Sequence, residues 1–402
     1  MSGRDPHEHG RTVTTLELLY DLVFVVAIGQ AANQFAHLVS EGHFIAATAA
    51  FLFAMFAVMW TWVNFSWFSS AFDTDDWPQR LATMVQMVGV TVIGLGLPAE
   101  FRSIDSGESI DIRIVVAGYV VIRAAMVFQW LRAARQSPQY RATCLTYAYA
   151  IVIAQIGWVA VTWVHLAWTE ALWAGVALLA FELAVPYLAE TRHRSTPWHA
   201  HHIAERYGGL LIIALGEGVV GTVASLSAVV QEQGWTLDAA LVAVAGMGLT
   251  FGMWWSYFLI STAEILHVRR QLAFKWAYCS MLLFAAIAAT GAGLHVAALV
   301  IAHEAHISPV AAVLALTIPV AVYVIGLYVL YSVLYREVHR FHLVLLLVTA
   351  LVLIAAPALA ASGVSMTTCL LVVMIAPAVN VIGYEVYGYR HVAAALDRAL
   401  GL

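Results

Sequence analysis

The chain has 402 residues, of which 62% are hydrophobic and only 11% are charged, and its formal net charge at pH 7 is -5. Soluble proteins are typically about 45–50% apolar and about 25% charged, so this composition excludes an ordinary water-soluble protein and predicts a lipid environment. The modest net charge, without a basic patch interleaved with aromatic residues, indicates no nucleic-acid partner.

Twelve apolar runs follow one another along the chain. A transmembrane helix needs about 20 predominantly apolar residues, and the runs are long enough for this. We therefore predict an all-α membrane protein with about 12 transmembrane helices. The runs cover 14–40, 43–70, 79–99, 112–132, 142–165, 168–189, 203–229, 236–263, 272–300, 309–335, 341–361 and 364–388.

The Lys and Arg residues predict the orientation, because positive side chains stay on the cytoplasmic side of short loops. With both termini in the cytoplasm, sixteen Lys and Arg residues fall in cytoplasmic segments, Arg206 among them. Only Arg102 and Arg113 fall in outer loops, and Arg123 falls within a span. We expect a multi-pass protein of the cell membrane (inner or plasma membrane) with cytoplasmic termini.

The first apolar run contains Glu17 and Asp21, which is not the pattern of a cleavable signal peptide. The three cysteines lie in or at the edge of predicted spans and have no CxxC spacing, so neither a disulfide framework nor a cysteine metal site is expected. They are Cys144, Cys279 and Cys369.

Two segments of the sequence are similar to each other. "YDLVFVVAIGQ" (20–30) aligns with "YGGLLIIALGE" (207–217), and weaker echoes follow in the second and fourth spans of each half. An even number of spans gives both copies the same membrane orientation. We predict two parallel six-helix repeats, at residues 1–195 and 196–402.

Ionisable side chains inside spans are costly and are therefore functional candidates. Glu17 and Asp21 are four residues apart and share one helix face, while Arg123, Glu182 and Glu217 lie within later spans. A buried arginine needs a partner, and Asp21, Glu182 and Glu217 are the available acids. These side chains form either a fixed ion pair that holds helices together or a path for a proton or cation. Three acids are more than one arginine needs as partners.

The segment "HHIAERYGGLLIIALGEGVVG" (201–221) begins with histidines and ends on the pattern GxGxxG. That pattern indicates a nucleotide loop only after a strand, and here it lies inside an apolar helix, so we expect no nucleotide cofactor and interpret its glycines as helix-packing residues. His202 and Glu205 are expected at the cytoplasmic entrance to the path. Without an HExxH motif we expect no metal there.

Aromatic residues gather in the second span and again in the eighth. Interfacial belts explain aromatic residues near helix ends, but a wall of rings beside the acidic helices is also suited to an organic ligand. The residues expected to line such a pocket are Tyr20, Trp60, Asn64 and Trp254.

The two motifs "LELLYDLVFVVAIGQ" (16–30) and "HHIAERYGGLLIIALGEGVVG" (201–221) resemble the low temperature requirement A (LtrA) family of bacterial membrane proteins. The hydrophobic layout agrees with that family over nearly the whole chain. The resemblance implies that the motif positions are Glu17, Asp21, His202, Glu205, Arg206 and Glu217. It implies no defined biochemical activity.

We expect the protein to move a small solute or cation along a path lined by intramembrane carboxylates. Asp21 and Glu217 would bind the ion or exchange protons, and Arg123 would be their counter-charge. The alternative is a membrane-embedded enzyme that uses the buried acids and histidines on a lipid-soluble substrate. The expected partners are the lipid bilayer, a small-molecule or ion ligand and a second copy of the chain.

Overall fold

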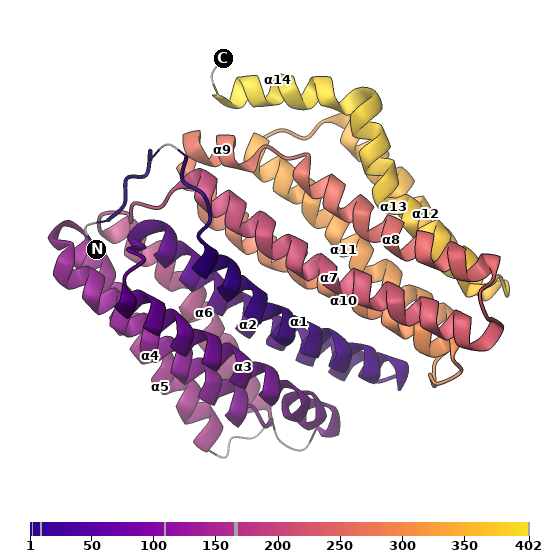
Figure 1. Ribbon diagram of the computed structural model, residues 1–402, viewed down its shortest axis with the longest axis horizontal. Coiled ribbons are helices and arrows are strands. Elements are labelled where there is room, and N and C mark those ends of the chain that lie inside the picture. Colours follow the sequence, from indigo (N-terminus) through magenta and orange to yellow (C-terminus); the bar gives the residue numbers. More distant parts are fainter. Residues whose placement is uncertain (2, 9, 108–109, 165–167, 401–402) are drawn as a thin grey trace. The chain divides into compact units, whose positions relative to one another are not determined.

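The computed structural model describes residues 1, 3–8, 10–107, 110–164 and 168–400, and all regular structure in these ranges is helical (Figure 1). Twelve helical segments in the described part are long and apolar enough to cross a membrane. The predicted number of spans and the all-α class are therefore confirmed. The expected fifth span ended at residue 165, which lies outside the described residues.

The helices follow the apolar runs closely. The long ones are α1 (Thr15–Ser40), α2 (Phe44–Phe72), α3 (Trp77–Ser106), α4 (Arg113–Gln136), α5 (Arg141–Trp163), α6 (Trp168–Arg192), α7 (Ala200–Gln233), α8 (Leu237–Phe258), α10 (Ala273–Ile301), α11 (Pro309–Tyr335), α12 (Arg340–Ala361) and α13 (Met366–Gly383). The short ones are η1 (Pro138–Tyr140), α9 (Thr262–Val268), η2 (Arg270–Leu272), η3 (Tyr384–Gly388) and α14 (Tyr389–Leu400).

The last span ends differently from the prediction. Helix α13 stops at Gly383, a π-helical turn follows as η3, and α14 then turns away from α13 (Figure 1). The sequence of α14 places Arg390, Asp397 and Arg398 among alanines, so this helix is amphipathic and not uniformly apolar. Its buried side is made by Val392, Ala395 and Ala399.

Hydroxyl and carboxylate caps set the starts of several helices. Asp76 accepts a hydrogen bond from the backbone N–H of Gln79 and begins α3, and Thr236 begins α8 in the same way. Ser308 and Ser365 cap α11 and α13. These caps satisfy N–H groups that the first helical turn leaves without partners.

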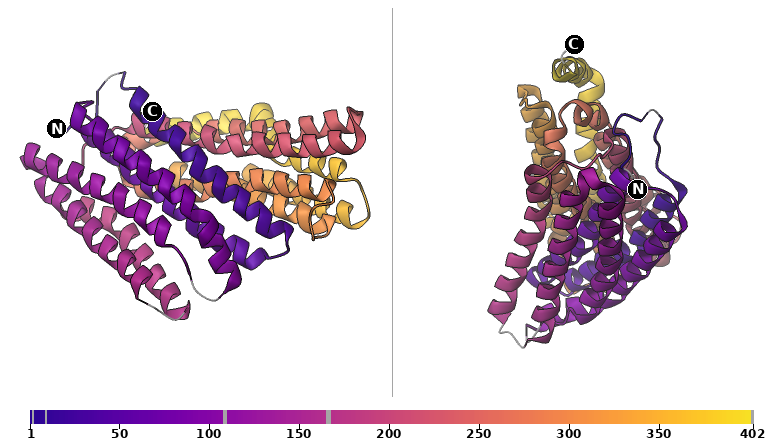
Figure 2. Two further views of the ribbon diagram at one scale, coloured as in Figure 1. Left: turned by 60° about the horizontal axis from the view of Figure 1, so that its bottom comes forward. Right: turned by 90° about the vertical axis from the view of Figure 1, so that its left-hand side faces the viewer.

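The chain divides into two compact units. Unit 1 contains residues 1–31 and 49–206, and unit 2 contains residues 32–48 and 207–402. In unit 1, α4 packs against α3 and α5, and α5 packs against α6. In unit 2, α10 packs against α11, and α13 packs against α8 and α12 (Figure 2). The predicted duplication of residues 1–195 and 196–402 stays a prediction.

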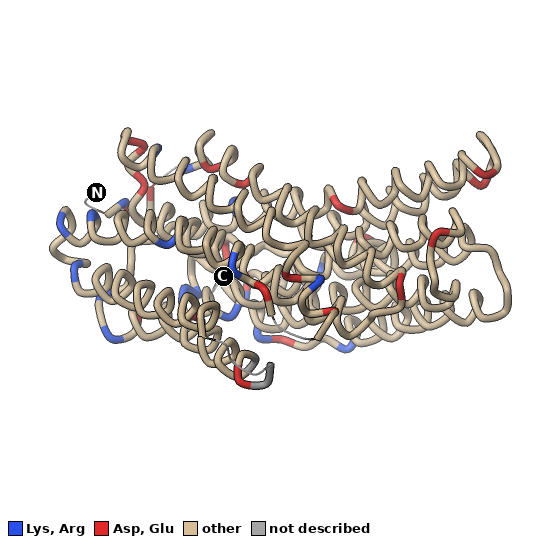
Figure 3. The backbone as a smooth tube through the Cα atoms, turned by 90° about the horizontal axis from the view of Figure 1, so that it is seen from below, with Lys and Arg blue, Asp and Glu red and all other residues tan. Residues whose placement is uncertain are grey.

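Charged residues are sparse along the helices, and long stretches carry none (Figure 3). The charges that do lie inside helices and away from solvent are therefore conspicuous. In unit 1 they include Glu17, Asp21, Arg123, Glu182 and Arg206, each at most 4% exposed.

Small residues allow close helix contacts in unit 2. A Cβ atom on Gly221 of α7 would lie 2.3 Å from the backbone oxygen of Gly291 in α10, and one on Gly291 would lie 2.4 Å from the carbonyl carbon of Glu217. Gly218 likewise faces Thr250. The packing role predicted for the glycines of 216–221 holds for Gly218 and Gly221, but a Cβ on Gly216 would meet nothing within 4 Å.

We expect Gly291→Ala to destabilise unit 2, because the added methyl group overlaps the α7 backbone and the helices must separate. Overpacking of this kind typically costs about 1–3 kcal/mol. The matched variant Gly216→Ala adds the same methyl group to open space and should leave stability unchanged or slightly raised. Thermal unfolding of the purified protein in detergent measures both, and equal melting temperatures for the two variants would contradict the packing argument.

Candidate functional site: a buried charged quartet

Two carboxylates of α1 lie against two basic side chains of α7. His202 Nε2 is 3.1 Å from Glu17 Oε2, and Arg206 Nη2 donates to Asp21 Oδ1 at 2.7 Å. Each helix contributes residues four apart, and both pairs join positions separated by 185 in the sequence. We call Glu17, Asp21, His202 and Arg206 the charged quartet; its members are at most 2% exposed.

The sequence of α1 explains why its acids face inward. Leu18, Leu22 and Val26 are more than half exposed and suit a lipid-facing surface, whereas Tyr20 and Phe24 are completely buried on the side of Asp21. A helix brings residues three and four apart onto one face, so burying the aromatic rings also buries the carboxylates.

Glu17 has a second, local role at the start of α1. Thr14 accepts a hydrogen bond from the backbone N–H of Glu17 at 3.2 Å, and Glu17 Oε2 accepts one from the backbone N–H of Thr14 at 2.9 Å. This reciprocal arrangement is a capping box. Its geometry holds the Glu17 carboxylate in position at the helix entrance.

Helix α2 contributes three further side chains that hydrogen-bond to the quartet. Ser69 donates to Glu17 Oε1 at 2.6 Å, Trp62 Nε1 donates to Asp21 Oδ1 at 2.7 Å, and Arg206 donates to Ser66 at 3.1 Å. The sequence interpretation missed these three residues. Their spacing of 62, 66 and 69 places them on one helix face, which is the signal that could have identified them.

Several polar atoms of the quartet have no hydrogen-bond partner among the described residues. They are Asp21 Oδ2, His202 Nδ1, and Nε and Nη1 of Arg206. A buried polar atom without a partner costs free energy unless it binds water, an ion or a ligand. Donor and acceptor atoms are both unpaired here, so the site can bind a polar guest of either kind.

The formal charges of the quartet do not cancel. Glu17 and Asp21 contribute two negative charges and Arg206 one positive charge, so the net charge is -1 with a neutral His202 and zero after one proton is added. A carboxylate only accepts hydrogen bonds, so His202 Nε2 carries a proton in its contact with Glu17. Taking up one proton or one monovalent cation therefore neutralises the site.

The neighbouring N-terminal residues do not supply the missing charge. Arg4 pairs with Glu8 and lies 3.5 Å from Asp73, and Arg11 donates to the backbone oxygens of residues 69 and 70. These two arginines and two carboxylates sum to zero charge, although Arg11 also interacts electrostatically with Glu17 of the quartet. Burial lowers the pKa of Arg11 to about 10, with a further decrease from Arg4, so Arg11 stays charged at neutral pH.

His199, beside the quartet, is held in its neutral form. Its Nδ1 accepts from the backbone N–H of His202, and its Nε2 lies 3.0 Å from the backbone oxygen of Glu8, which needs a donor. One accepting and one donating nitrogen define a neutral imidazole. Burial also lowers the pKa of His199.

A second ion pair lies elsewhere in unit 1. Arg123 of α4 pairs with Glu182 of α6, whose oxygens also accept from Trp60 Nε1 at 2.5 Å, Trp158 Nε1 at 2.8 Å and the hydroxyl of Tyr119 at 2.8 Å. This carboxylate thus links α2, α4, α5 and α6. A cavity of about 10 Å³, enough for about one water molecule, adjoins the pair and is lined in part by Trp60 and Asn64.

Tyr20 continues the polar contacts of α1 toward α3 and α4. Its hydroxyl donates to Gln86 Oε1 at 3.3 Å, and Gln86 Nε2 donates to Gln129 Oε1 at 2.9 Å. Its ring lies against Phe65 of α2, with the ring centroids 3.8 Å apart. These contacts place Tyr20 between α1, α2 and α3.

The partner assigned to Asp21 from the sequence requires correction. We expected Arg123 to be its counter-charge, but Arg206 pairs with Asp21, and Arg123 pairs with Glu182. Asp21 and Arg206 are each the seventh residue of their helix, so they reach the same depth when the helix starts lie together. Arg206 was counted among the cytoplasmic residues because it stands near a span boundary, yet it is fully buried in α7.

Three other expected site residues are not members of the quartet. Glu205 is exposed, and its carboxylate accepts from the backbone N–H of Val13 at 3.2 Å. Glu217, in unit 2, is half-buried and has no hydrogen bond or ion pair to its carboxylate among the described residues. Trp254 is 37% exposed and stacks on Phe251 at 5.5 Å between ring centroids.

Glu100 of α3 is a buried acid that the sequence interpretation missed. It is 0% exposed, and neither carboxylate oxygen has a hydrogen-bond partner among the described residues. It follows the predicted third span by a single residue, so its position looked like a loop. The helix continues to Ser106 and carries Glu100 inside unit 1. Within the described residues, no group of three or more His, Cys, Asp or Glu side chains is arranged to hold a metal ion.

Comparison with known proteins gives one family. The family model described as "Bacterial low temperature requirement A protein (LtrA)" matches residues 12–377. A protein of Rhizobium meliloti (strain 1021), itself described as uncharacterized, is 26% identical over 249 residues, which cover 60% of this chain and 57% of that protein. The chain thus aligns with little more than half of that relative. No solved structure matches significantly.

We expect Arg206→Met to destabilise the protein by about 3–5 kcal/mol, because it leaves Asp21 buried without its counter-charge. The double variant Arg206→Met with Asp21→Leu removes both charges and should recover much of that loss. Arg113→Gln breaks an exposed pair with Asp111 and should have little effect. Melting temperatures in detergent test this series. An unchanged melting temperature for Arg206→Met would show that its ion pair with Asp21 does not stabilise the protein.

Proposed function

The chain belongs to the bacterial low temperature requirement A (LtrA) family and has twelve candidate membrane spans, and from its site we propose that it moves a small solute or cation across a membrane. In this proposal the charged quartet binds and releases a proton during each cycle. The membrane is the cell membrane, with both termini in the cytoplasm, as the distribution of Lys and Arg predicts.

The observation that carries this proposal is the unbalanced charge of the quartet. A net buried charge is unfavourable in a low-dielectric environment, so the site favours the uptake of one positive charge. An ion pair that only holds helices together needs no excess charge, and the pair of Arg123 with Glu182 has none. Histidine is the side-chain type that most often takes up and releases a proton in proteins, and His202 is the histidine of the quartet.

Proton binding and cation binding would compete at the quartet. A proton on His202 converts its contact with Glu17 into an imidazolium–carboxylate pair and leaves no net charge for a cation. Loss of that proton restores the charge of -1, and the unpaired Asp21 Oδ2 then offers an oxygen ligand. Two ligands that exclude each other are thermodynamically coupled, which is the requirement for exchange transport.

The remaining buried groups take supporting roles in the proposal. The Arg123–Glu182 pair is balanced and makes several hydrogen bonds, so it positions α4 and α6 and lines the small cavity beside Trp60. The half-buried carboxylate of Glu217 provides a further cation or proton site in unit 2. A membrane-embedded enzyme remains the alternative prediction from the sequence.

We expect Asp21→Asn to abolish proton flux and His202→Gln to reduce it strongly. Asparagine keeps the size of the side chain but removes the negative charge, and glutamine keeps a hydrogen-bonding group but does not titrate. The assay uses liposomes containing the full chain and a trapped pH-sensitive dye. An outward gradient of K⁺ or Na⁺ is imposed, and proton entry is recorded from the change in fluorescence.

Arg113→Gln serves as the control for the transport assay, because its salt bridge with Asp111 is exposed and lies apart from the quartet. It should retain the wild-type rate. The melting temperature of each variant separates loss of transport from loss of folding. Equal proton entry in the wild type, Asp21→Asn and protein-free liposomes would refute proton-coupled exchange of these cations.

A further inference from the structure

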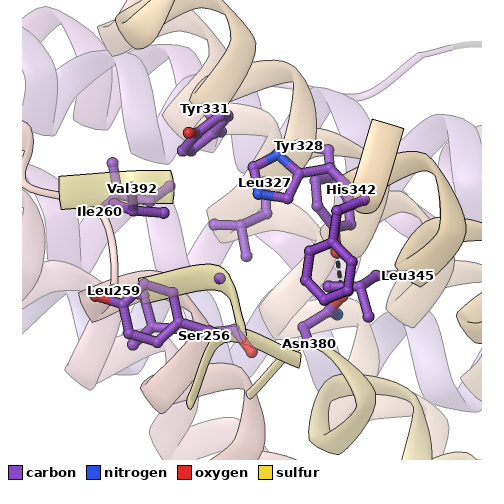
Figure 4. Close-up of a pocket in the computed structure, with 13 residues that line it drawn as sticks. Ser256, Leu259, Ile260, Leu327, Tyr328, Tyr331, His342, Leu345, Asn380 and Val392 are labelled. Carbon is purple, nitrogen blue, oxygen red and sulfur yellow. Dashed lines mark hydrogen bonds between the residues drawn. The ribbon is translucent and has the colours of Figure 1, made fainter. Parts of the chain in front are cut away.

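Unit 2 contains a cavity of about 60 Å³ where the ends of several helices meet (Figure 4). Its thirteen lining residues come from α8, the α8–α9 connection, α11, α12, α13, the π-helical turn and α14. All of them belong to unit 2, whereas the four residues of the charged quartet belong to unit 1. The inference drawn from it does not depend on the proposed transport function.

The lining is mostly apolar and aromatic. Leu327, Leu345 and Val392 provide aliphatic surface, and the rings of Tyr328 and Tyr331 stand on the α11 side (Figure 4). None of the thirteen residues is Asp, Glu, Lys or Arg. Since burying a charge without a partner is costly, this cavity favours an uncharged guest.

One polar side chain is directed into this apolar space. The imidazole of His342 points toward Tyr331 and Leu327 and has no hydrogen bond among the described residues (Figure 4). The centroids of the His342 and Tyr331 rings are 4.5 Å apart, with the rings nearly perpendicular. A neutral imidazole has one donor and one acceptor nitrogen, so it can hold one hydroxyl group of a ligand.

Two of the other polar side chains that line the cavity are already engaged. The hydroxyl of Tyr328 donates to Asn380 Oδ1 at 2.5 Å, and the hydroxyl of Ser256 donates to the backbone oxygen of residue 252 at 2.7 Å (Figure 4). These bonds fix the ring of Tyr328, whereas the His342 imidazole and the neighbouring Tyr331 hydroxyl make no hydrogen bond among the described residues and are available for recognition. An apolar pocket with one or a few convergent polar groups is the usual form of a small-molecule site.

The C-terminal segment forms one wall of the cavity, and its backbone conformation is a second indication that the cavity is functional. Tyr384 and Gly388 belong to the π-helical turn, a rare conformation that is frequent at functional sites. Val392 of α14 closes the same side. These residues and Asn380 follow residue 377, where the family match ends, so this wall is not part of the matched family region.

We propose that this cavity binds a small, uncharged aromatic molecule that carries one hydroxyl group. The ring packs against Tyr328 and Tyr331, and the hydroxyl bonds with the His342 imidazole. Helix α14 forms one side of the site: Val392 lines the cavity, and the His391 ring lies 4.4 Å from the ring of His339.

Photolabelling of the full chain in detergent tests this assignment. The probe is a phenol that carries a photoreactive diazirine, and the comparison probe is a benzoic acid with the same diazirine. After irradiation, proteolysis and mass spectrometry locate the label. We expect the phenol to label peptides from 327–331 and 341–345, with competition by unlabelled phenol, and the charged benzoate to label them much less.

Two matched variants on α11 distinguish the cavity from the lipid-facing surface. Leu327 lines the cavity and is 7% exposed, whereas Ile325 of the same helix is 52% exposed. Leu327→Trp should fill the cavity and abolish specific labelling, and Ile325→Trp should retain it. His342→Phe keeps a ring but loses the hydrogen bond, and should weaken binding about three- to tenfold.

The assignment is overturned if labelling by the phenol is not reduced by unlabelled phenol, or if it persists unchanged in Leu327→Trp. Stronger labelling by the benzoate would also overturn it, because the cavity has no cation to pair with a carboxylate. The competition measurement needs only the wild-type chain, so the proposal remains testable if Leu327→Trp fails to fold.

Discussion

The structure of unit 1 depends on the cost of removing charges from water. Two carboxylates on α1 are buried, and they are stable there only because α7 presents a histidine and an arginine at the same depth. This requirement brings together the starts of α1 and α7, which are far apart in the sequence. It also orients α2, whose serines and tryptophan supply the remaining hydrogen bonds.

Most of the fold could be predicted from the sequence because lipid imposes a simple rule of length and apolarity. That rule located most of the twelve spans within a few residues, although α3 continues to Ser106, beyond its predicted end at residue 99. It failed at the C-terminus, where a π-helical turn and an amphipathic helix replace the end of a single span. Apolar content alone does not distinguish a helix that crosses the membrane from one that turns away at its end.

The site was only partly predictable. Intramembrane charge identified Glu17, Asp21, Arg123 and Glu182, but pairing depends on which helices are neighbours, and sequence distance does not reveal this. Arg206 was counted with the cytoplasmic residues because it lies near the start of the run 203–229, and Glu100 was overlooked because it lies just beyond the predicted end of a span. Ser66 and Ser69 carried no charge to attract notice, although their spacing with Trp62 marks one face of α2.

The equal spacing of the two pairs has a consequence for movement. Sliding α1 along α7 by one turn would bring Asp21 to His202 and leave Glu17 and Arg206 without partners, while smaller shifts would pair neither set. The observed register is therefore the one that pairs all four groups, and even a whole-turn shift of about 5.4 Å leaves two buried charges without partners. Two pairs at equal spacing therefore fix the axial position of these two segments, which a single pair would leave free to rotate about its contact.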